Sequence, residues 1–188
     1  MSKYPQIFPE IMAELMAWSK QIDESQIDAM ADAIAEAKRI FVAGAGRSGF
    51  AARAFANRLA HVGFTVYFVG DVTTPPIGAG DLLIINSGSG TTKGLVTMAE
   101  SARKKGADIA TVTIFPDHTI GSMSKAVIKL PATTNQYLTP DSQVSRLQPM
   151  GNLYEQMSLI VLDTVSTKLI AASGQAEEEL FARHANLE

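Results

Sequence analysis

The stretch Ile84-Ile85-Asn86-Ser87-Gly88-Ser89-Gly90-Thr91-Thr92 decides how this chain folds. An apolar run, Leu82 to Ile85, ends in alternating serine and glycine, and a helix-compatible segment, Lys93 to Lys105, follows directly. This order predicts a buried strand, a tight turn and the start of a helix. Glycines let the turn point its N–H groups one way, and nearby hydroxyls add donors beside the positive end of the helix: Ser87, Ser89, Thr91 and Thr92. We expect this Ser/Gly cup, residues 87–92, to bind phosphate and not to be a flexible linker, because linkers are not held between a strand and a helix.

A second glycine-rich turn lies upstream of the cup. Residues 39–43 form a β-branched and aromatic run, followed by Gly44-Ala45-Gly46-Arg47-Ser48-Gly49 and a helix-compatible segment at 50–62. The spacing G-x-G-x-x-G, with Asp71 about 20 residues further on, also fits a dinucleotide fingerprint. A dinucleotide fold has no need of a second cup, so two such loops favour one compact phosphorylated ligand. We expect Gly46 and Ser48 to contact it, whereas Arg47 either neutralises the anion or stays solvated.

Three further apolar runs complete the predicted sheet, at residues 65–69, 108–114 and 126–130. Strands that alternate with helices of about 10 to 15 residues predict an α/β fold, a three-layer α-β-α sandwich with a five-stranded parallel sheet. Ligands of such sheets bind at the carboxyl ends of the strands. Thr73 and Thr74, in the loop after residue 69, therefore either contact ligand hydroxyls or satisfy their own turn.

Two amphipathic helices are expected before the sheet. Apolar residues recur at helical spacing between residues 10 and 22, and again from Ile27 to Ile34. Ser25, followed three residues later by Asp28, resembles a capping box for the second helix. Trp18 is expected to pack, either within the chain or against a second subunit.

The C-terminal third begins with a long segment, residues 131–151, that lacks a periodic pattern. Asn152 then resembles an N-cap, with Glu155 three residues later and a strongly apolar helix after it. Glu155 either closes a capping box or serves as a proton-transferring base beside the loop. A final helix is expected from Gln175 to Arg183-His184. We expect His184, and also His118 in its Pro-Asp-His-Thr turn, to be exposed.

Composition excludes several classes of function. The 188 residues are 46% hydrophobic and 19% charged, which fits one globular domain. A net charge of -3 gives no general attraction to nucleic acid or to an anionic membrane. The chain has no cysteine and three widely spaced histidines, so we expect no thiolate chemistry and no metal site. No targeting signal or membrane span is visible, and we expect a cytoplasmic protein.

The assembled segments resemble the sugar isomerase (SIS) domain family and, within it, the 6-phospho-3-hexuloisomerases. The resemblance covers essentially the whole chain, which we interpret as a single SIS domain, 1–188, with an N-terminal helical segment, 1–38, before the sandwich and C-terminal helices, 39–188. The two glycine-rich loops are typical of the broad family, and two later segments look specific to the hexuloisomerases. The segments are Val42-Ala43-Gly44-Ala45-Gly46-Arg47-Ser48-Gly49, Val69-Gly70-Asp71-Val72-Thr73-Thr74-Pro75, Ser87-Gly88-Ser89-Gly90, Gln148-Pro149-Met150-Gly151-Asn152-Leu153-Tyr154-Glu155-Gln156 and Arg183-His184-Ala185-Asn186-Leu187-Glu188.

This resemblance implies an isomerase that interconverts 3-hexulose 6-phosphate and fructose 6-phosphate through an enediol, in the ribulose monophosphate pathway of formaldehyde fixation or pentose phosphate supply. It implies Glu155 as catalytic base and no redox cofactor or metal. It also implies a homotetramer with sites at subunit boundaries, where His184 of a neighbouring subunit is a candidate for the site. Phosphate binding is implied at Ser48 and at Ser87, Gly88, Ser89, Gly90, Thr91 and Thr92, and Arg47, Thr73 and Thr74 are candidates for the sugar oxygens.

One position departs from the family pattern. Related loops commonly read Ser-Gly-Ser-Gly-Glu-Thr, and this chain has Thr91 in place of the glutamate. Any role of that carboxylate therefore does not transfer. Three alternatives stay open: another SIS-type phosphosugar isomerase, a non-catalytic sugar-phosphate sensor, which normally carries an additional module, and a dinucleotide-binding protein.

Overall fold

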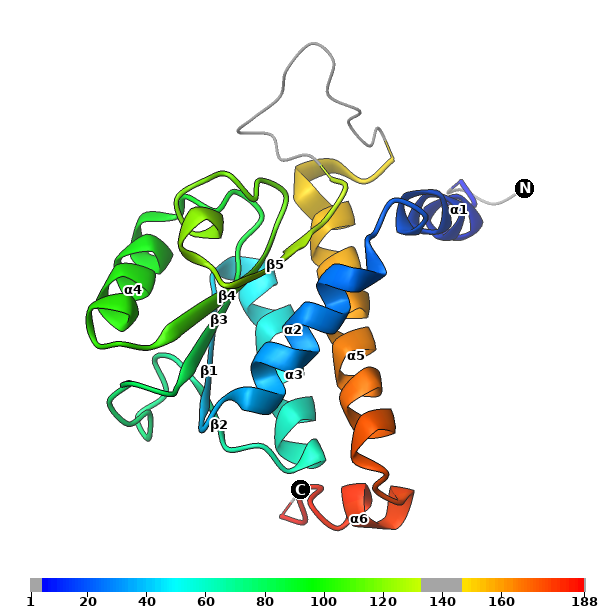
Figure 1. Ribbon diagram of the computed structural model, residues 1–188. Helices are drawn as coiled ribbons and strands as arrows, with labels where there is room; N and C mark the ends of the chain where they lie inside the picture. The colour runs from blue at the N-terminus through cyan, green and yellow to red at the C-terminus, as the bar shows by residue number, and fades with distance from the viewer. Residues whose placement is uncertain (1–4, 133–146, 188) are drawn as a thin grey trace.

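A five-stranded sheet forms the centre of the molecule, in a computed structural model that describes residues 5–132 and 147–187 (Figure 1). The strands are β1 (Ile40–Gly44), β2 (Val66–Phe68), β3 (Leu82–Asn86), β4 (Asp108–Thr113) and β5 (Ala126–Lys129). All neighbouring strands are parallel, and their order is β2-β1-β3-β4-β5. This is the flavodoxin-like order of doubly wound sheets, which confirms the predicted fold class and differs from the usual dinucleotide-binding order.

Helices cover the two faces of the sheet unequally. The helices α2 (Glu24–Glu36), α3 (Gly46–Val62) and α5 (Asn152–Ser173) pack on one face, and α4 (Lys93–Lys104) packs on the other (Figure 1). Alternate residues of β3 pack into the hydrophobic cores on the two faces of the sheet. Ile84 packs against the layer of α2, α3 and α5, and Ile85 packs against α4. Both faces of β3 are therefore buried, which explains its unbroken apolar run. Burial of each such side chain contributes about 1.5–3 kcal/mol.

The strand ends that lead into the two glycine-rich loops lie side by side. Gly44 at the end of β1 is paired in register with Asn86 at the end of β3. The first loop is tight, since a Cβ on Gly49 would lie 2.8 Å from the carbonyl oxygen of Gly44. This close approach allows α3 to begin at Gly46, four residues before the expected start at Phe50. Both loops thus leave the sheet at the carboxyl ends of its neighbouring strands β1 and β3.

The start of α2 differs from the prediction. Asp23 is its N-cap, and the Asp23 carboxylate accepts hydrogen bonds from the backbone N–H of Ser25 (2.9 Å) and from its hydroxyl (2.7 Å). Ser25 is therefore not the cap. An ionised carboxylate is a stronger acceptor for the helix amides than a neutral hydroxyl.

The remaining elements lie outside the sandwich. The helix α1 (Phe8–Ser19) lies beside α5 and away from the sheet, and the short α6 (Glu177–Phe181) lies at the C-terminal end of α5 (Figure 1). Two single 3-10 turns, η1 (Gly121–Met123) and η2 (Pro149–Gly151), precede β5 and α5. Residues 69–81 connect β2 to β3 without a helix. Most of the predicted long loop, residues 133–146, lies outside the described residues.

Candidate active site

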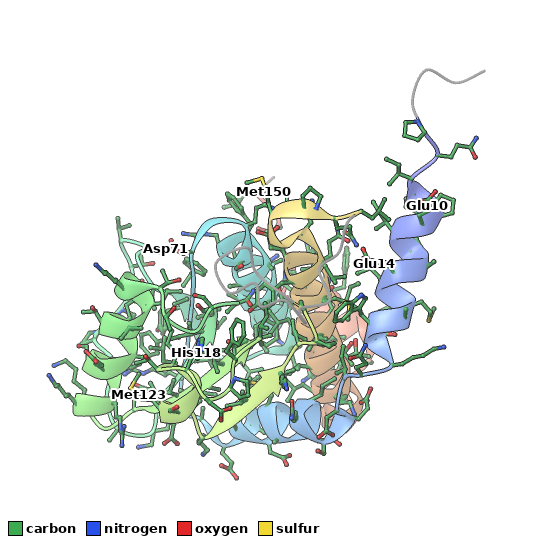
Figure 2. The ribbon with its side chains drawn as sticks, turned by 90° about the horizontal axis from the view of Figure 1, so that it is seen from above. Glu10, Glu14, Asp71, His118, Met123 and Met150 are labelled. Carbon is green, nitrogen blue, oxygen red and sulfur yellow. The ribbon has the colours of Figure 1, made fainter. Side chains whose placement is uncertain are left out.

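A cavity of about 290 Å³ lies where the loops after β1 and β3 meet the N-terminal end of α5. Figure 2 looks onto this region from above and shows Met150 at the turn that begins α5. The cavity is lined by residues of all three segments: Ala45, Ser48, Asn86, Ser87, Gly88, Ser89, Thr92, Leu95, Met150, Gly151, Tyr154 and Glu155. The structure therefore brings Ser48, much of the cup and Glu155 into one site.

The Ser/Gly cup is held by its own turn and by the segment after β4. The backbone N–H of Gly90 donates to both the carbonyl oxygen and the hydroxyl of Ser87, each at 3.2 Å, and Gly90 has a φ of +63°. That left-handed conformation favours glycine. The Ser89 and Thr92 hydroxyls lie 3.4 Å apart, with both residues lining the cavity. Their placement beside the N-terminus of α4 suits an anion.

His118 contacts the cup directly, contrary to the expectation that it is solvated. Its Nδ1 lies 2.8 Å from the carbonyl oxygen of Ser89, and its ring stacks on Phe115 with centroids 4.6 Å apart. The N–H of Ile120 donates to the carbonyl oxygen of Gly90 at 3.1 Å. Residues 115–120, which follow β4, pack against the cup and make both contacts.

Glu155 forms an ion pair across the site with Arg47. The Glu155 side chain is 18% exposed and the Arg47 side chain 63%, so the carboxylate is sheltered while the guanidinium stays at the rim. Arg47 is therefore not simply a solvated loop residue. It does not line the main cavity but a neighbouring groove with Phe50 and Leu159.

The predicted capping box at Asn152 is wrong. Gly151 is the N-cap of α5, with a φ of +88°, and Met150 before it is also left-handed, with a φ of +61°. Two successive left-handed residues turn the chain sharply into the helix, so the Asn152 side chain does not cap it. For Met150, a residue with a Cβ, this conformation costs on the order of 1–3 kcal/mol. The Glu155 carboxylate is consequently available to Arg47 and to the cavity.

Sequence reasoning assigned no role to Asn86 and Tyr154, which line the cavity although they are buried, at 1% and 2% exposure. The Tyr154 hydroxyl shares its single proton between two acceptors, the Asn86 side-chain oxygen (2.5 Å) and the Val112 carbonyl oxygen (2.8 Å). Burial, followed by the nearby Glu155 carboxylate, raises the pKa of Tyr154 well above its usual value, so the phenol stays neutral. In the sequence, Asn86 stands out only as a polar residue at the end of an apolar strand, and Tyr154 does not stand out at all.

Other predicted residues lie outside the cavity lining. Gly46, Gly90 and Thr91 form the backbone of the two turns, and Thr91 donates its N–H to the Ser89 hydroxyl at 3.3 Å. The Thr74 hydroxyl donates to the carbonyl oxygen of Phe68 at 2.8 Å, so its hydrogen bond is made within its own turn. Thr74 also lines a separate pocket beside α4. Thr73 is exposed in the same loop.

His184 lies far from the site of its own chain. Its ring stacks on His61, with centroids 5.1 Å apart, in the last turn of α3, whose first turn carries Ser48. The 17 residues of α3 separate these two ends by about 25 Å. A contact of His184 with a neighbouring subunit's site stays a prediction.

Within residues 5–132 and 147–187, no group of three or more histidine or acidic side chains is arranged to hold a metal ion. In the same part of the chain, no helix combines the length and apolar character that crossing a membrane requires.

Comparison with known proteins gives consistent matches. The family model of the SIS domain matches residues 33–162. The chain is 41% identical to the 3-hexulose-6-phosphate isomerase of Bacillus subtilis, over 95% of this chain and 96% of that protein. It is 45% identical to the 3-hexulose-6-phosphate isomerase of Mycobacterium gastri, over 93% of this chain and 86% of that protein.

A solved structure agrees with these relatives. The crystal structure of a Methanococcus jannaschii protein, for which a function of 3-hexulose-6-phosphate isomerase was inferred, superposes with a TM-score of 0.79. The two chains share 34% identity, with 97% of each covered. By the domain match, the identities and the fold, this chain belongs to the SIS domain family.

Proposed function

We propose that this protein interconverts 3-hexulose 6-phosphate and fructose 6-phosphate. One observation carries the proposal: a hydroxyl-rich cup at a helix N-terminus and the sheltered carboxylate of Glu155 line the same cavity. The cup suits a phosphate and the carboxylate suits a proton-transferring base. The names of the relatives that are 41% and 45% identical support this choice of substrate pair.

The reaction moves a carbonyl group between two adjacent carbons. In our proposal Glu155 removes the proton from carbon 2 of the 3-ketose, and the electron pair forms the enediol between carbons 2 and 3. Glu155 then returns the proton to carbon 3, while a hydroxyl proton passes from oxygen 2 to oxygen 3, so that atoms and charge balance. The phosphate held in the cup keeps the reacting carbons beside the carboxylate.

Ser48, Ser87, Ser89 and Thr92 are proposed as the hydroxyl contacts of the phosphate. Ser48 approaches from the first turn of α3 and the others from the cup, so the donors converge from two helix N-termini. Arg47 is proposed to orient Glu155 in the free protein and to interact with a sugar oxygen during turnover. The Arg47 side chain is 63% exposed, which leaves room at the rim for a substrate oxygen beside Glu155.

A homo-oligomer, and specifically a tetramer, is also proposed. Apolar side chains are exposed on adjoining elements: Phe8, Met12 and Met16 on α1, Phe50 on α3, and Leu159 and Ile160 on α5. Met12 and Met16 line one groove with Ile160, and Phe50 lines another with Leu159. Exposed apolar surface of this kind is typical of subunit interfaces. Light scattering coupled to size-exclusion chromatography tests this state, and a monomer at micromolar concentration contradicts it.

The activity is tested in a coupled assay. Enzymatically made 3-hexulose 6-phosphate is supplied, and fructose 6-phosphate is detected through glucose-6-phosphate isomerase and an NADP-linked dehydrogenase. We expect turnover that depends on this protein and exceeds turnover of pentose and heptose phosphates. Preference for another phosphosugar contradicts the proposed substrate, and binding of fructose 6-phosphate without turnover of any sugar contradicts the enzyme assignment.

A further inference from the structure

The Asn86 side chain lies where the three segments of the site meet. It ends β3 immediately before the Ser/Gly cup and is 1% exposed. Its Nδ2 donates to the Ser48 carbonyl oxygen at 3.0 Å and to the Ser158 hydroxyl at 3.1 Å. Its Oδ1 accepts the hydrogen bond from Tyr154 at 2.5 Å. One amide therefore links β3 to α3 and to α5.

The orientation of this amide is determined by its partners. The Ser48 carbonyl oxygen can only accept, so the amide nitrogen must face it. The Ser158 hydroxyl donates its own proton to the Glu155 carbonyl oxygen at 2.9 Å and is left to accept from Asn86. The remaining amide oxygen faces the neutral phenol of Tyr154. A buried amide whose polar atoms all have partners holds its neighbours in one arrangement.

The partners of Asn86 are next to groups that line the cavity. Ser48 and Tyr154 themselves line it, and Tyr154 directly precedes Glu155. The Tyr154 ring also packs on the cup, since a Cβ on Gly88 would lie 3.2 Å from its Cδ1. Ser158 follows Glu155 by about one helical turn. A shift of the amide would thus be passed to both the cup and the carboxylate.

We propose that Asn86 is a positioning residue that sets the placement of Glu155 on α5 relative to the phosphate-binding cup. This inference rests on the proposed function, which assigns proton transfer and phosphate binding to those two groups. Core stability alone does not require an amide here, because the four preceding residues of β3 are Leu82, Leu83, Ile84 and Ile85, and burying polar atoms is costly. Misplacement of reacting groups by about 1 Å can lower a rate by about 100-fold.

The test compares Asn86→Leu with a matched control, Thr111→Val. Thr111 is equally buried, on the neighbouring strand β4, and its hydroxyl donates to the Ile85 carbonyl oxygen at 2.8 Å. Kinetics are measured well below the Tm of each variant. We expect Asn86→Leu to lower kcat by at least about 10-fold, and Thr111→Val to keep it within about 2-fold, at a similar loss in Tm. Equal kcat values for the two variants at equal Tm loss overturn the proposal.

Ser158→Ala provides the test if Asn86→Leu does not fold. It removes one hydroxyl partner of the amide on α5, at a position that does not line the cavity, and leaves the bond to Ser48. We expect a lower kcat with KM for the sugar phosphate changed by less than about 2-fold, because the cup is retained. A purely structural role would lower Tm without lowering kcat at an unchanged KM, and that result overturns the proposal.

Failure of the proposed function is separable from failure of this inference. A wild-type protein without turnover contradicts the function, and crystal structures of wild type and Ser158→Ala then decide the positioning role. We expect the Glu155 carboxylate to shift relative to the Ser87 Cα by more than about 0.5 Å, the tolerance of a functional site. An unchanged separation overturns the inference.

Discussion

Arg47 in the first turn of α3 and Glu155 in the first turn of α5 form an ion pair beside the cavity, although 108 residues separate them in the sequence. The pair joins the two helices at the end where the glycine-rich loops leave the sheet. It places a cation next to the carboxylate that is proposed to move protons.

Glu155→Gln is expected to abolish most turnover and preserve binding. The amide is nearly isosteric and can keep a hydrogen bond, but it cannot accept a carbon-bound proton. We expect kcat to fall by at least about 100-fold, as general-base loss requires, while fructose 6-phosphate still raises the Tm. Near-normal turnover would remove Glu155 from its proposed role.

Arg47→Gln tests the other half of the pair. Loss of the guanidinium frees the Glu155 side chain to adopt other rotamers and removes a donor for the sugar oxygens. We expect kcat/KM to fall by at least about 10-fold, with partial recovery in Arg47→Lys, which retains charge but not the planar fork. Arg58→Gln, an exposed arginine on the same helix, is the control and is expected to match wild type. Equal losses in both glutamine variants would indicate a general charge effect.

Removing hydroxyls from the cup is expected to weaken the hold on phosphate. Ser89→Ala deletes a cavity-lining donor, and Ser87→Ala deletes one that also accepts from Gly90 at 3.2 Å. Each is predicted to raise KM for the sugar phosphate by at least about 10-fold, because a hydrogen bond to a charged group contributes about 1.5–3 kcal/mol. Ser101→Ala, on the exposed part of α4, serves as control. An unchanged KM in both cup variants would show that the phosphate binds elsewhere.

His118→Ala is expected to loosen the cup without touching the proposed base. The imidazole contacts the Ser89 carbonyl oxygen at 2.8 Å and packs against Phe115. We expect an increase in KM larger than any change in kcat. His118→Asn should restore part of the affinity, because its side-chain N–H can take the place of Nδ1. Identical kinetics for the alanine and asparagine variants would argue against this hydrogen bond.

Acid stability is predicted to depend on Asp81, which precedes β3. Arg39 donates to both carboxylate oxygens, at 2.9 and 2.6 Å, and Gly78 donates its N–H at 2.8 Å. The hydrogen bond from Arg39 lowers the pKa of Asp81, and burial only partly opposes it. Because the unfolded state then binds a proton more readily, the stabilisation is complete above the unfolded pKa and is lost as pH falls through the lower folded pKa.

Asp81→Asn should therefore lower the free energy of unfolding by about 1–3 kcal/mol near neutral pH, measured by urea denaturation. The difference from wild type should shrink as the pH is lowered below about 3.9. Asp32→Asn, an exposed carboxylate on α2, is the control. A difference that stays constant from neutral to acid pH would contradict the role of the ionised carboxylate.

Much of the fold follows from local sequence patterns, and the helix-cap predictions that are wrong also have local causes. The apolar run at residues 82–85 predicts a strand buried on both faces, and the structure places it at the centre of the sheet. The helix caps predicted at Ser25 and Asn152 are wrong, because the Asp23 carboxylate caps α2 and Gly151 adopts the left-handed N-cap conformation of α5. The Thr74 hydroxyl bonds to the backbone of its own turn, which is one of the two roles that the sequence allows for it.

The sequence by itself determined that this chain forms a parallel sheet with hydroxyl-rich glycine turns at its strand ends, because strand periodicity and turn chemistry act over a few residues. Only the tertiary structure decided which polar side chains meet. The pairing of Gly44 with Asn86 brings the two turns together, and the packing of α3 on α5 brings Arg47 to Glu155 and Ser158 to Asn86. These contacts depend on register and helix packing across long stretches of chain, which no local pattern encodes. For the Ser/Gly cup, the tertiary structure also brought His118, from the segment after β4, into contact with the Ser89 carbonyl oxygen.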